Sequence, residues 1–314
     1  MDDVLVRASP RSSPAIHVAL FLATVATTLW AGFQLSPLAG RAPTLPNVVM
    51  GGLPFAGSLV AILFCHEMGH YLVARRHGVT ATLPYFIPVP FGAGTLGAVI
   101  RMRSQIPSRR AALDIAAAGP IAGFVVAVPL LLWGFAHSEV REVASSPVGS
   151  ALASPYALAR ALLAGRPLLA GDPGTQFFGD SLVTTAAARL VHGLLPPGHD
   201  LVLHPVAFAA WLGLLITTLN LVPLGQLDGG HVVYALVGRR WAHRLSRLVS
   251  AALLAAGLFL SWNWVVWWAL TRFVIGLRHP PSALEEPLDP ARAAIALLCV
   301  VLFALTFVPV PVSF

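Results

Sequence analysis

The chain has 314 residues, of which 57% are hydrophobic and 11% are charged, whereas soluble domains carry about 25% charged residues. Apolar stretches long enough to cross a bilayer recur along it, so the composition predicts an all-α polytopic membrane protein. The formal net charge is +7, and all 20 basic residues are arginines. Most of them lie in short clusters at the ends of apolar runs, which is typical of membrane topology and argues against a nucleic-acid partner.

The N-terminal half begins with a polar segment, residues 1–14, which we expect to be a disordered cytosolic tail. A first span follows at about 15–35. Its apolar stretch is longer than the core of a signal peptide, so we expect it to remain uncleaved. After a loop rich in proline and glycine, a second span covers about 51–76 and ends in Arg75-Arg76-His77.

The second span contains the sequence His66-Glu67-Met68-Gly69-His70. Ionisable side chains at membrane depth cost about 2.5–3.5 kcal/mol each on insertion scales, so three of them within five positions need a function. On a helix, residues four apart share one face. His66 and His70 can therefore hold the same Zn²⁺ ion, with Glu67 beside the open position of the metal.

The segment from Thr80 to Pro107 changes character. It is rich in proline, glycine and β-branched residues, which predicts a short membrane-associated β-hairpin or re-entrant loop. Such a backbone is tolerated at membrane depth only against protein or a water-filled cavity. A third span follows at about 111–136, in which the small residues of Ala118–Gly123 allow close helix approach.

The longest polar stretch, residues 137–204, is expected to lie outside the cytosol, with short helical pieces near 155–169 and 181–195. It lacks the run of strands that a PDZ-type module needs.

The C-terminal part holds the remaining predicted spans. A fourth begins near Pro205, is broken at Pro223 and Gly225, and resumes to about 238. We expect a helical hairpin over about 248–277 and a last span over about 291–310. This gives about six or seven spans in one integral-membrane domain, residues 15–314, with a catalytic core at about 51–238. The cytosolic side then carries most of the arginines, including the cluster at 239–247.

Two histidines do not complete a catalytic zinc site, which usually has three protein ligands. Asp228 is the best candidate for the third, because it follows a helix break at the same predicted depth as the histidines. Asp114 is interpreted instead as a helix-start residue facing the dipole, and Asp289 as a helix cap. His77 and His231 flank the site, but we expect neither to be a ligand. The two cysteines, Cys65 and Cys299, read as core thiols.

Zinc activates a water molecule and polarises a carbonyl, while Glu67 is the candidate general base and later proton donor. The reaction expected from this arrangement is amide hydrolysis within the bilayer. An unwound substrate helix needs new hydrogen-bond partners, which a strand edge at Gly94–Arg103 would provide. The alternative for that stretch is a loop that only packs the helices.

The motif His66-Glu67-x-x-His70 and the stretch Asn220-x-x-Pro223-x-x-x-x-Asp228-Gly229 together resemble the site-2 protease family of intramembrane zinc metalloproteases. The segments Gly94–Ala98, Ala118–Gly123 and Gln226–Gly230 look most like the cyanobacterial and chloroplast branch, which has no PDZ domain.

The resemblance implies zinc bound by His66, His70 and Asp228, and Glu67 as the catalytic acid and base. It makes Asn220 a substrate or oxyanion contact, although a helix-packing amide is the competing interpretation. The expected substrate-binding residues are Gly94, Thr95, Leu96 and Gly97.

Transmembrane proteins are the expected substrates and the lipid bilayer is the expected environment. We expect a multi-pass protein of the bacterial cytoplasmic membrane, with the site near the cytosolic side. The competing functions are a membrane metal transporter, in which Glu67 would lack a role, and a catalytically silent scaffold.

Overall fold

The computed structural model describes residues 13–142, 154–163, 177–277, 282–284 and 286–313. Within these ranges the structure is mostly helical, as predicted. The helices are α1 (Pro14–Gln34), α2 (Leu45–Arg76), α3 (Arg109–Ala136), α4 (Pro155–Leu163), α5 (Leu182–His192), α6 (Pro205–Leu221), α7 (Asp228–Phe259), α8 (Trp262–Leu270) and α9 (Pro290–Thr306), with a π-helical turn at Thr271–Ile275. Three two-stranded antiparallel sheets accompany them: β1 (Tyr85–Pro88) with β2 (Thr95–Val99), β3 (Glu139–Glu142) with β5 (His199–Val202), and β4 (Phe177–Phe178) with β6 (Val312–Ser313).

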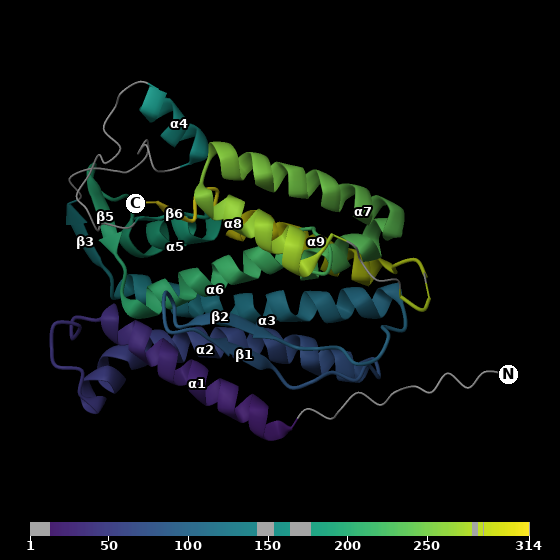
Figure 1. Ribbon diagram of the computed structural model, residues 1–314, viewed down its shortest axis with the longest axis horizontal. Helices are drawn as coiled ribbons and strands as arrows, with labels where there is room; N and C mark the ends of the chain where they lie inside the picture. Colours follow the sequence, from purple (N-terminus) through teal and green to yellow (C-terminus); the bar gives the residue numbers. More distant parts are fainter. Residues whose placement is uncertain (1–12, 143–153, 164–176, 278–281, 285, 314) are drawn as a thin grey trace.

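The long helices lie side by side with roughly parallel or antiparallel axes (Figure 1). Helices α1, α2, α3 and α6 follow one another across the molecule, and α7, α8 and α9 lie beyond α6. One apolar core joins residues of α3, α6, α7 and α9. Its buried members are Leu113, Ala116, Ala117, Leu221, Val232, Ala235, Ala296, Cys299 and Leu302. Segments far apart in the sequence are therefore packed around α3.

Three helices of the described part, α1, α2 and α3, are long and apolar enough to cross a membrane. Helices α6 and α9 are also apolar but have 17 residues each. At 1.5 Å per residue such a helix is about 25 Å long, slightly less than a hydrocarbon core of about 30 Å. By length and composition, the structure thus supports three of the six or seven expected spans.

The second helix begins earlier than the sequence predicts. The proline- and glycine-rich stretch before residue 51 was expected to be a loop, but α2 starts at Leu45, with Thr44 as its N-cap and Pro46 in its first turn. Proline is tolerated there because the first N–H groups of a helix have no intrahelical partner. A further proline, Pro54, lies inside the helix.

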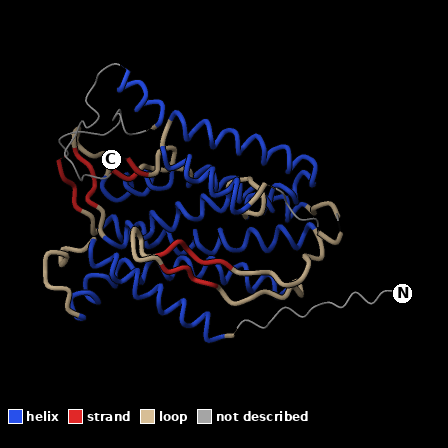
Figure 2. The backbone as a smooth tube through the Cα atoms, viewed as in Figure 1, coloured by secondary structure: helices blue, strands red, loops and turns tan. Residues whose placement is uncertain are grey.

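The segment after α2 forms the expected β-hairpin, β1–β2, which runs along the helices (Figure 2). It is fixed to the first helix, since the Thr27 hydroxyl donates to the Gly94 carbonyl at 2.7 Å. Gly94 has a φ of +81°, and a Cβ there would lie 2.5 Å from the Thr27 carbonyl oxygen. Only glycine fits this close approach of hairpin and helix.

The polar stretch 137–204 contains the two short helices, α4 and α5, that the sequence predicts; residues 164–169 of the expected first piece lie outside the described residues, as does most of the expected N-terminal tail. The pair of four-residue strands β3 and β5, which brings the two ends of this stretch together, was not predicted.

The predicted break after α6 is confirmed. The chain leaves the helix at Leu221 and re-enters one at Asp228. Gly225 turns the chain with a φ of +54°, and its N–H donates to the Ser246 hydroxyl at 3.2 Å. The expected end of the resumed helix near residue 238 is confirmed, because the backbone of Gly238 is non-helical (φ +77°, ψ +169°). A second helical part follows directly, and the two parts together make up α7, which runs to Phe259.

A turn at 260–261 then separates α7 from α8, which pack against each other, so the expected helical hairpin is present. A Cβ on Gly257 would lie 2.7 Å from the Val265 backbone nitrogen, which shows how close the two helices are.

Candidate metal centre

The two histidines of α2 meet on one face of that helix, as their spacing predicts. Both side chains are buried, and the Nε2 atoms of His66 and His70 are 3.2 Å apart. The two rings are nearly perpendicular, with centroids 4.9 Å apart. Each ring therefore directs a nitrogen to the same point beside α2.

The break between α6 and α7 brings Asp228 to that point. Its Oδ2 atom lies 3.3 Å from His70 Nε2 and 3.5 Å from His66 Nε2. Among the described residues, His66, His70 and Asp228 form the group of histidine, cysteine and acidic side chains that could hold a metal ion. Three electron-pair donors directed at one point repel each other unless a cation or a proton lies between them. The arrangement is that of a metal site.

Backbone and packing contacts fix the orientation of His70. Its Nδ1 atom lies 2.7 Å from the carbonyl oxygen of Ile115 in α3. A carbonyl only accepts, so Nδ1 carries the proton and Nε2 keeps its lone pair for a metal, which is a common arrangement for metal-binding histidines. The ring lies against Gly119, where a Cβ would meet Nε2 of His70 most closely and come within 2.5 Å of its Cδ2 and Cε1 atoms.

Other small residues hold α2 close to α3. A Cβ on Gly69 would lie 2.5 Å from the Ala118 carbonyl oxygen, and one on Gly123 would lie 3.1 Å from Nδ1 of His66. The close approach expected from the segment Ala118–Gly123 is thus observed. The segment does more than pack two helices, because it also forms the surface on which both histidine rings lie.

Glu67 lies next to the cluster but does not belong to it. Its side chain is buried, and its carboxylate accepts a hydrogen bond from the backbone N–H of Ile100, directly after β2. The hairpin therefore reaches the candidate general base. A carboxylate held beside the three donor atoms is placed to take and return a proton rather than to bind the metal.

Asn220 also reaches the site, from the last turn of α6. Its Nδ2 atom lies 3.4 Å from Nε2 of His66. The side chain is partly buried.

The competing acids and histidines lie elsewhere. Asp289 is the N-cap of α9, as predicted, and accepts from the Arg292 N–H at 3.0 Å. The interpretation of Asp114 as a helix-start residue is wrong. It lies beyond the first turn of α3 and pairs with Arg292 and His77 instead.

His231, in the first turn of α7, donates to the Gln226 carbonyl and is not part of the cluster.

The residues expected to bind substrate differ in exposure. Gly94, Thr95 and Gly97 are buried, and the Thr95 hydroxyl bonds within the hairpin to the Ile87 carbonyl at 3.0 Å. Leu96, by contrast, has 67% of its surface exposed. In the described residues, β2 pairs with β1 alone, so one long edge of β2 has no strand partner.

Sequence reasoning missed three contributions to this site: the Ile115 carbonyl, the Ile100 N–H and the contact of Gly119 with a histidine ring. The first two are backbone groups, which leave no mark in the identity of the residue. The glycine was recognisable as part of a small-residue segment, but its partner was not.

Comparison with known proteins agrees with this geometry. The chain matches the model of Peptidase family M50 over residues 54–263, which covers both histidines, Glu67, Asn220 and Asp228. The chain belongs to this family, and the resemblance to site-2 proteases is confirmed. No solved structure matches it significantly.

Several plant proteins are related to the chain. A protein of Oryza sativa subsp. indica named "Probable zinc metalloprotease EGY2, chloroplastic" is 34% identical over 266 residues, which cover 82% of this chain and 43% of that protein. The EGY2 protein of Arabidopsis thaliana is 30% identical over 85% of this chain and 44% of its own length. A rice protein named "Probable zinc metalloprotease EGY3, chloroplastic" is 30% identical over 93% and 47%. The chain spans less than half the length of each of these relatives.

Proposed function

We propose that this protein is an intramembrane zinc metalloprotease that hydrolyses peptide bonds within or near the transmembrane segments of other proteins. The observation that carries the proposal is the buried group of His66, His70 and Asp228, with Glu67 next to it, on and beside an apolar helix. The family and the names of the relatives support it. The alternatives, a transporter or a silent scaffold, are not favoured, because both leave the buried Glu67 without a role.

The three donor atoms fit a zinc ion. With Zn–N and Zn–O bonds of about 2.0–2.1 Å and tetrahedral angles, ligand atoms lie about 3.3 Å from one another. The distances among the Nε2 atoms and the Asp228 oxygen are 3.2, 3.3 and 3.5 Å. Two histidines and one carboxylate are also a ligand set known for catalytic zinc, which keeps a fourth position open.

When bound, zinc supplies an activated water and Lewis-acid polarisation of the carbonyl that is attacked. The protein residues direct the protons. Glu67 accepts the proton of the attacking water through its carboxylate and then delivers it to the nitrogen of the leaving amine. The Ile100 N–H holds that carboxylate in place, and the Ile115 carbonyl keeps the proton of His70 on Nδ1, away from the metal.

Asn220 is proposed to contact the carbonyl of the scissile bond through its side-chain amide. Support comes from its position at 3.4 Å from His66 Nε2, on the helix that ends at the break. A hydrogen-bond donor at this point would stabilise negative charge that develops on the carbonyl oxygen.

The β-hairpin is proposed to hold the substrate. A transmembrane helix must unwind before its carbonyls are accessible, and its free backbone groups then need partners, because unsatisfied groups cost several kcal/mol in apolar surroundings. The unpaired edge of β2 offers such partners, and Ile100, which follows β2, contacts Glu67. Of the four expected substrate-binding residues, Leu96 is the exposed one, so we propose it as the main side-chain contact.

We further propose six or seven membrane spans within one domain, with the site near the cytosolic side of a bacterial cytoplasmic membrane. Support comes from the apolar helices α6 and α9 beside the three long ones, and from the arginines in the 239–247 segment of α7. The broken backbone at 222–227 is acceptable at membrane depth, because it is covered by protein and its groups bond locally, as in Leu227 N–H to Leu224 carbonyl at 3.1 Å.

The proposal is tested with the full chain purified in lipid bilayers, a transmembrane model peptide and a zinc chelator. Glu67→Gln should keep zinc and the fold but lose cleavage at least about 10²-fold, the usual contribution of general acid–base catalysis. Glu139→Gln, which changes an exposed acid in β3, is the matched control and should cleave normally. Near-normal turnover by Glu67→Gln, or cleavage unaffected by the chelator, would refute the proposal.

A further inference from the structure

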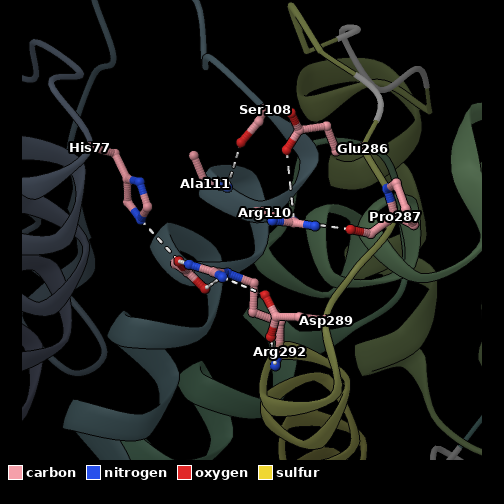
Figure 3. Close-up of polar contacts among 9 residues, drawn as sticks. His77, Ser108, Arg110, Ala111, Glu286, Pro287, Asp289 and Arg292 are labelled. Atoms are coloured by element: carbon pink, nitrogen blue, oxygen red, sulfur yellow. Dashed lines mark hydrogen bonds and ion pairs between the residues drawn. The ribbon is translucent and has the colours of Figure 1, made fainter.

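An ionic network joins α2, α3 and α9 at one end of the bundle. Its centre is Asp114 of α3, whose Oδ2 atom lies 2.9 Å from Nε2 of His77 and 2.8 Å from Nη2 of Arg292. Figure 3 shows His77 and Arg292 approaching from opposite sides, one from the end of α2 and the other from the start of α9. The network therefore connects three helices that are distant in the sequence.

Arg292 is fixed at both edges of its guanidinium group. Its Nε atom lies 3.0 and 3.1 Å from the two oxygens of Asp114, and its Nη1 atom lies 2.5 Å from Asp289. Asp289 in turn caps α9, and its contacts with the Arg292 backbone N–H and guanidinium hold the pKa of its carboxyl below the ordinary value. A guanidinium that bonds two carboxylates in this way is geometrically demanding, and lysine cannot replace it.

The network is directly next to the contact that orients a metal ligand. Asp114 precedes Ile115, whose carbonyl accepts the hydrogen bond from Nδ1 of His70. His77 is the C-cap of α2 and follows His70 by seven residues, about two helical turns, so both side chains lie on the same side of that helix. Helices α2 and α3 are thus joined twice along one face, once through each histidine.

Close packing at Gly69, Ala118 and Gly119 sets how near the two helices come, and the apolar cores that they share, with Ile62 of α2 and Leu131 of α3, contribute to their alignment. Apolar contacts of this kind are not directional. The hydrogen bond from His70 requires a particular position of the Ile115 carbonyl along α2. The His77–Asp114–Arg292 contacts are directional and add that constraint next to the Ile115 carbonyl.

We propose that Asp114, held by Arg292 and His77, is a positioning residue for the metal ligand His70. It fixes the position of α3 along the axis of α2, and so keeps the Ile115 carbonyl within hydrogen-bonding distance of His70 Nδ1. The inference rests on the proposed zinc site but concerns residues that do not touch it. Arg292 also ties α3 to α9, which shares its apolar core with the helix that begins at Asp228.

The test measures zinc affinity by competition with a chromophoric chelator, on the full chain in detergent, for Asp114→Asn and Arg292→Gln. Direct partners of metal-binding histidines change affinity about 10- to 100-fold when mutated. Because Asp114 acts through one further residue, we expect about a tenfold loss in each variant, at the low end of that range. In the Co²⁺-substituted protein the visible absorption bands should also shift.

Arg110→Gln is the matched control. Arg110 lies near the start of α3 and contacts the Pro287 carbonyl at 3.0 Å and Glu286 at 3.8 Å (Figure 3). Among the described residues, the hydrogen bonds and ion pairs of Asp114 are those with Arg292 and His77. The substitution Arg110→Gln thus removes arginine contacts at the same end of the bundle, and the zinc affinity of this variant should stay at the wild-type value. The double variant Asp114→Asn/Arg292→Gln should be no worse than Asp114→Asn alone, since both changes break one network.

The outcomes separate this inference from the proposed function. If the wild-type chain binds no zinc, the proposed function fails. If it binds zinc and both network variants bind it equally well, or if Arg110→Gln loses as much affinity as they do, the positioning role is refuted. Should Asp114→Asn not fold, Arg292→Lys decides, because it keeps the charge but loses the two-edged contact. Full affinity in that variant would overturn the inference, and a loss with an unchanged melting temperature of the zinc-free protein would support it.

Discussion

Replacing Gly119 by alanine is the sharpest single test of how the site is built. The added Cβ would meet Nε2 of His70 most closely and would lie 2.5 Å from two of its ring carbons, whereas ordinary contacts begin near 3.4 Å. The ring must therefore move by more than about 1 Å, or α3 must move away from α2 by a similar amount. The first movement stretches the 2.7 Å contact of Nδ1 with the Ile115 carbonyl and turns Nε2 away from the other two ligands.

The size of the effect follows from the cost of overpacking, about 1–3 kcal/mol for a methyl group in a well-packed interior. If the ring of His70 yields, that cost appears as a loss of zinc affinity of about 5- to 150-fold. The assay is a chelator competition titration, together with cleavage of a transmembrane peptide and the melting temperature of the zinc-free protein.

Two other glycines provide graded controls. A Cβ on Gly123 would lie 3.1 Å from Nδ1 of His66, so Gly123→Ala needs a shift of only a few tenths of an ångström and should cost under about fivefold in affinity. A Cβ on Gly57 would meet nothing closer than Leu53 Cδ1 at 3.9 Å, so Gly57→Ala should leave zinc binding unchanged. The reasoning is refuted if Gly119→Ala binds zinc like the wild type, or if the three variants lose affinity equally.

Three further predictions concern the ligands, the hairpin and the topology. Asp228→Ala should lower bound zinc well below one ion per chain by elemental analysis, because two imidazoles alone leave the site open, whereas Asp200→Ala, at an exposed acid, should not. A photo-cross-linker at Leu96 should capture a transmembrane substrate in the Glu67→Gln background, and one at Val140 in β3 should not; the opposite pattern contradicts substrate binding by β2. On a chain without its native cysteines, a membrane-impermeant thiol reagent added outside should label Val140→Cys but not His243→Cys, and the reverse would overturn the proposed orientation.

The sequence was sufficient for the parts of the site that depend on spacing along one helix or on a strong break signal. The four-residue separation of the histidines placed His66 and His70 on one face. Pro223 and Gly225 marked the end of α6, and so placed Asp228 at a helix start near the same depth. Both signals are local, and the physics that they reflect is not altered by the rest of the fold.

The parts that could not be predicted depend on partners far away in the chain. Asp114 pairs with Arg292, 178 positions later, and nothing near Asp114 indicates this. The start of α2 was placed too late because a proline in a first turn looks the same in sequence as a proline in a loop. The end of the first part of α7 at Gly238 was predicted, but the second helical part that begins directly after it was not.

The separation of the ligands along the chain has a consequence for how the protein is made. His66 and Asn220 are 154 positions apart, and Asp228 is farther still. At synthesis rates of about 5–20 residues per second, roughly 8–30 s pass between the two histidines and the aspartate. During that interval the growing chain carries two of the three proposed metal ligands, so the proposed site is incomplete. If the proposed function holds, newly inserted helices nearby, including those of the chain itself, are not exposed to an active protease until α7 has been made and has packed against α3.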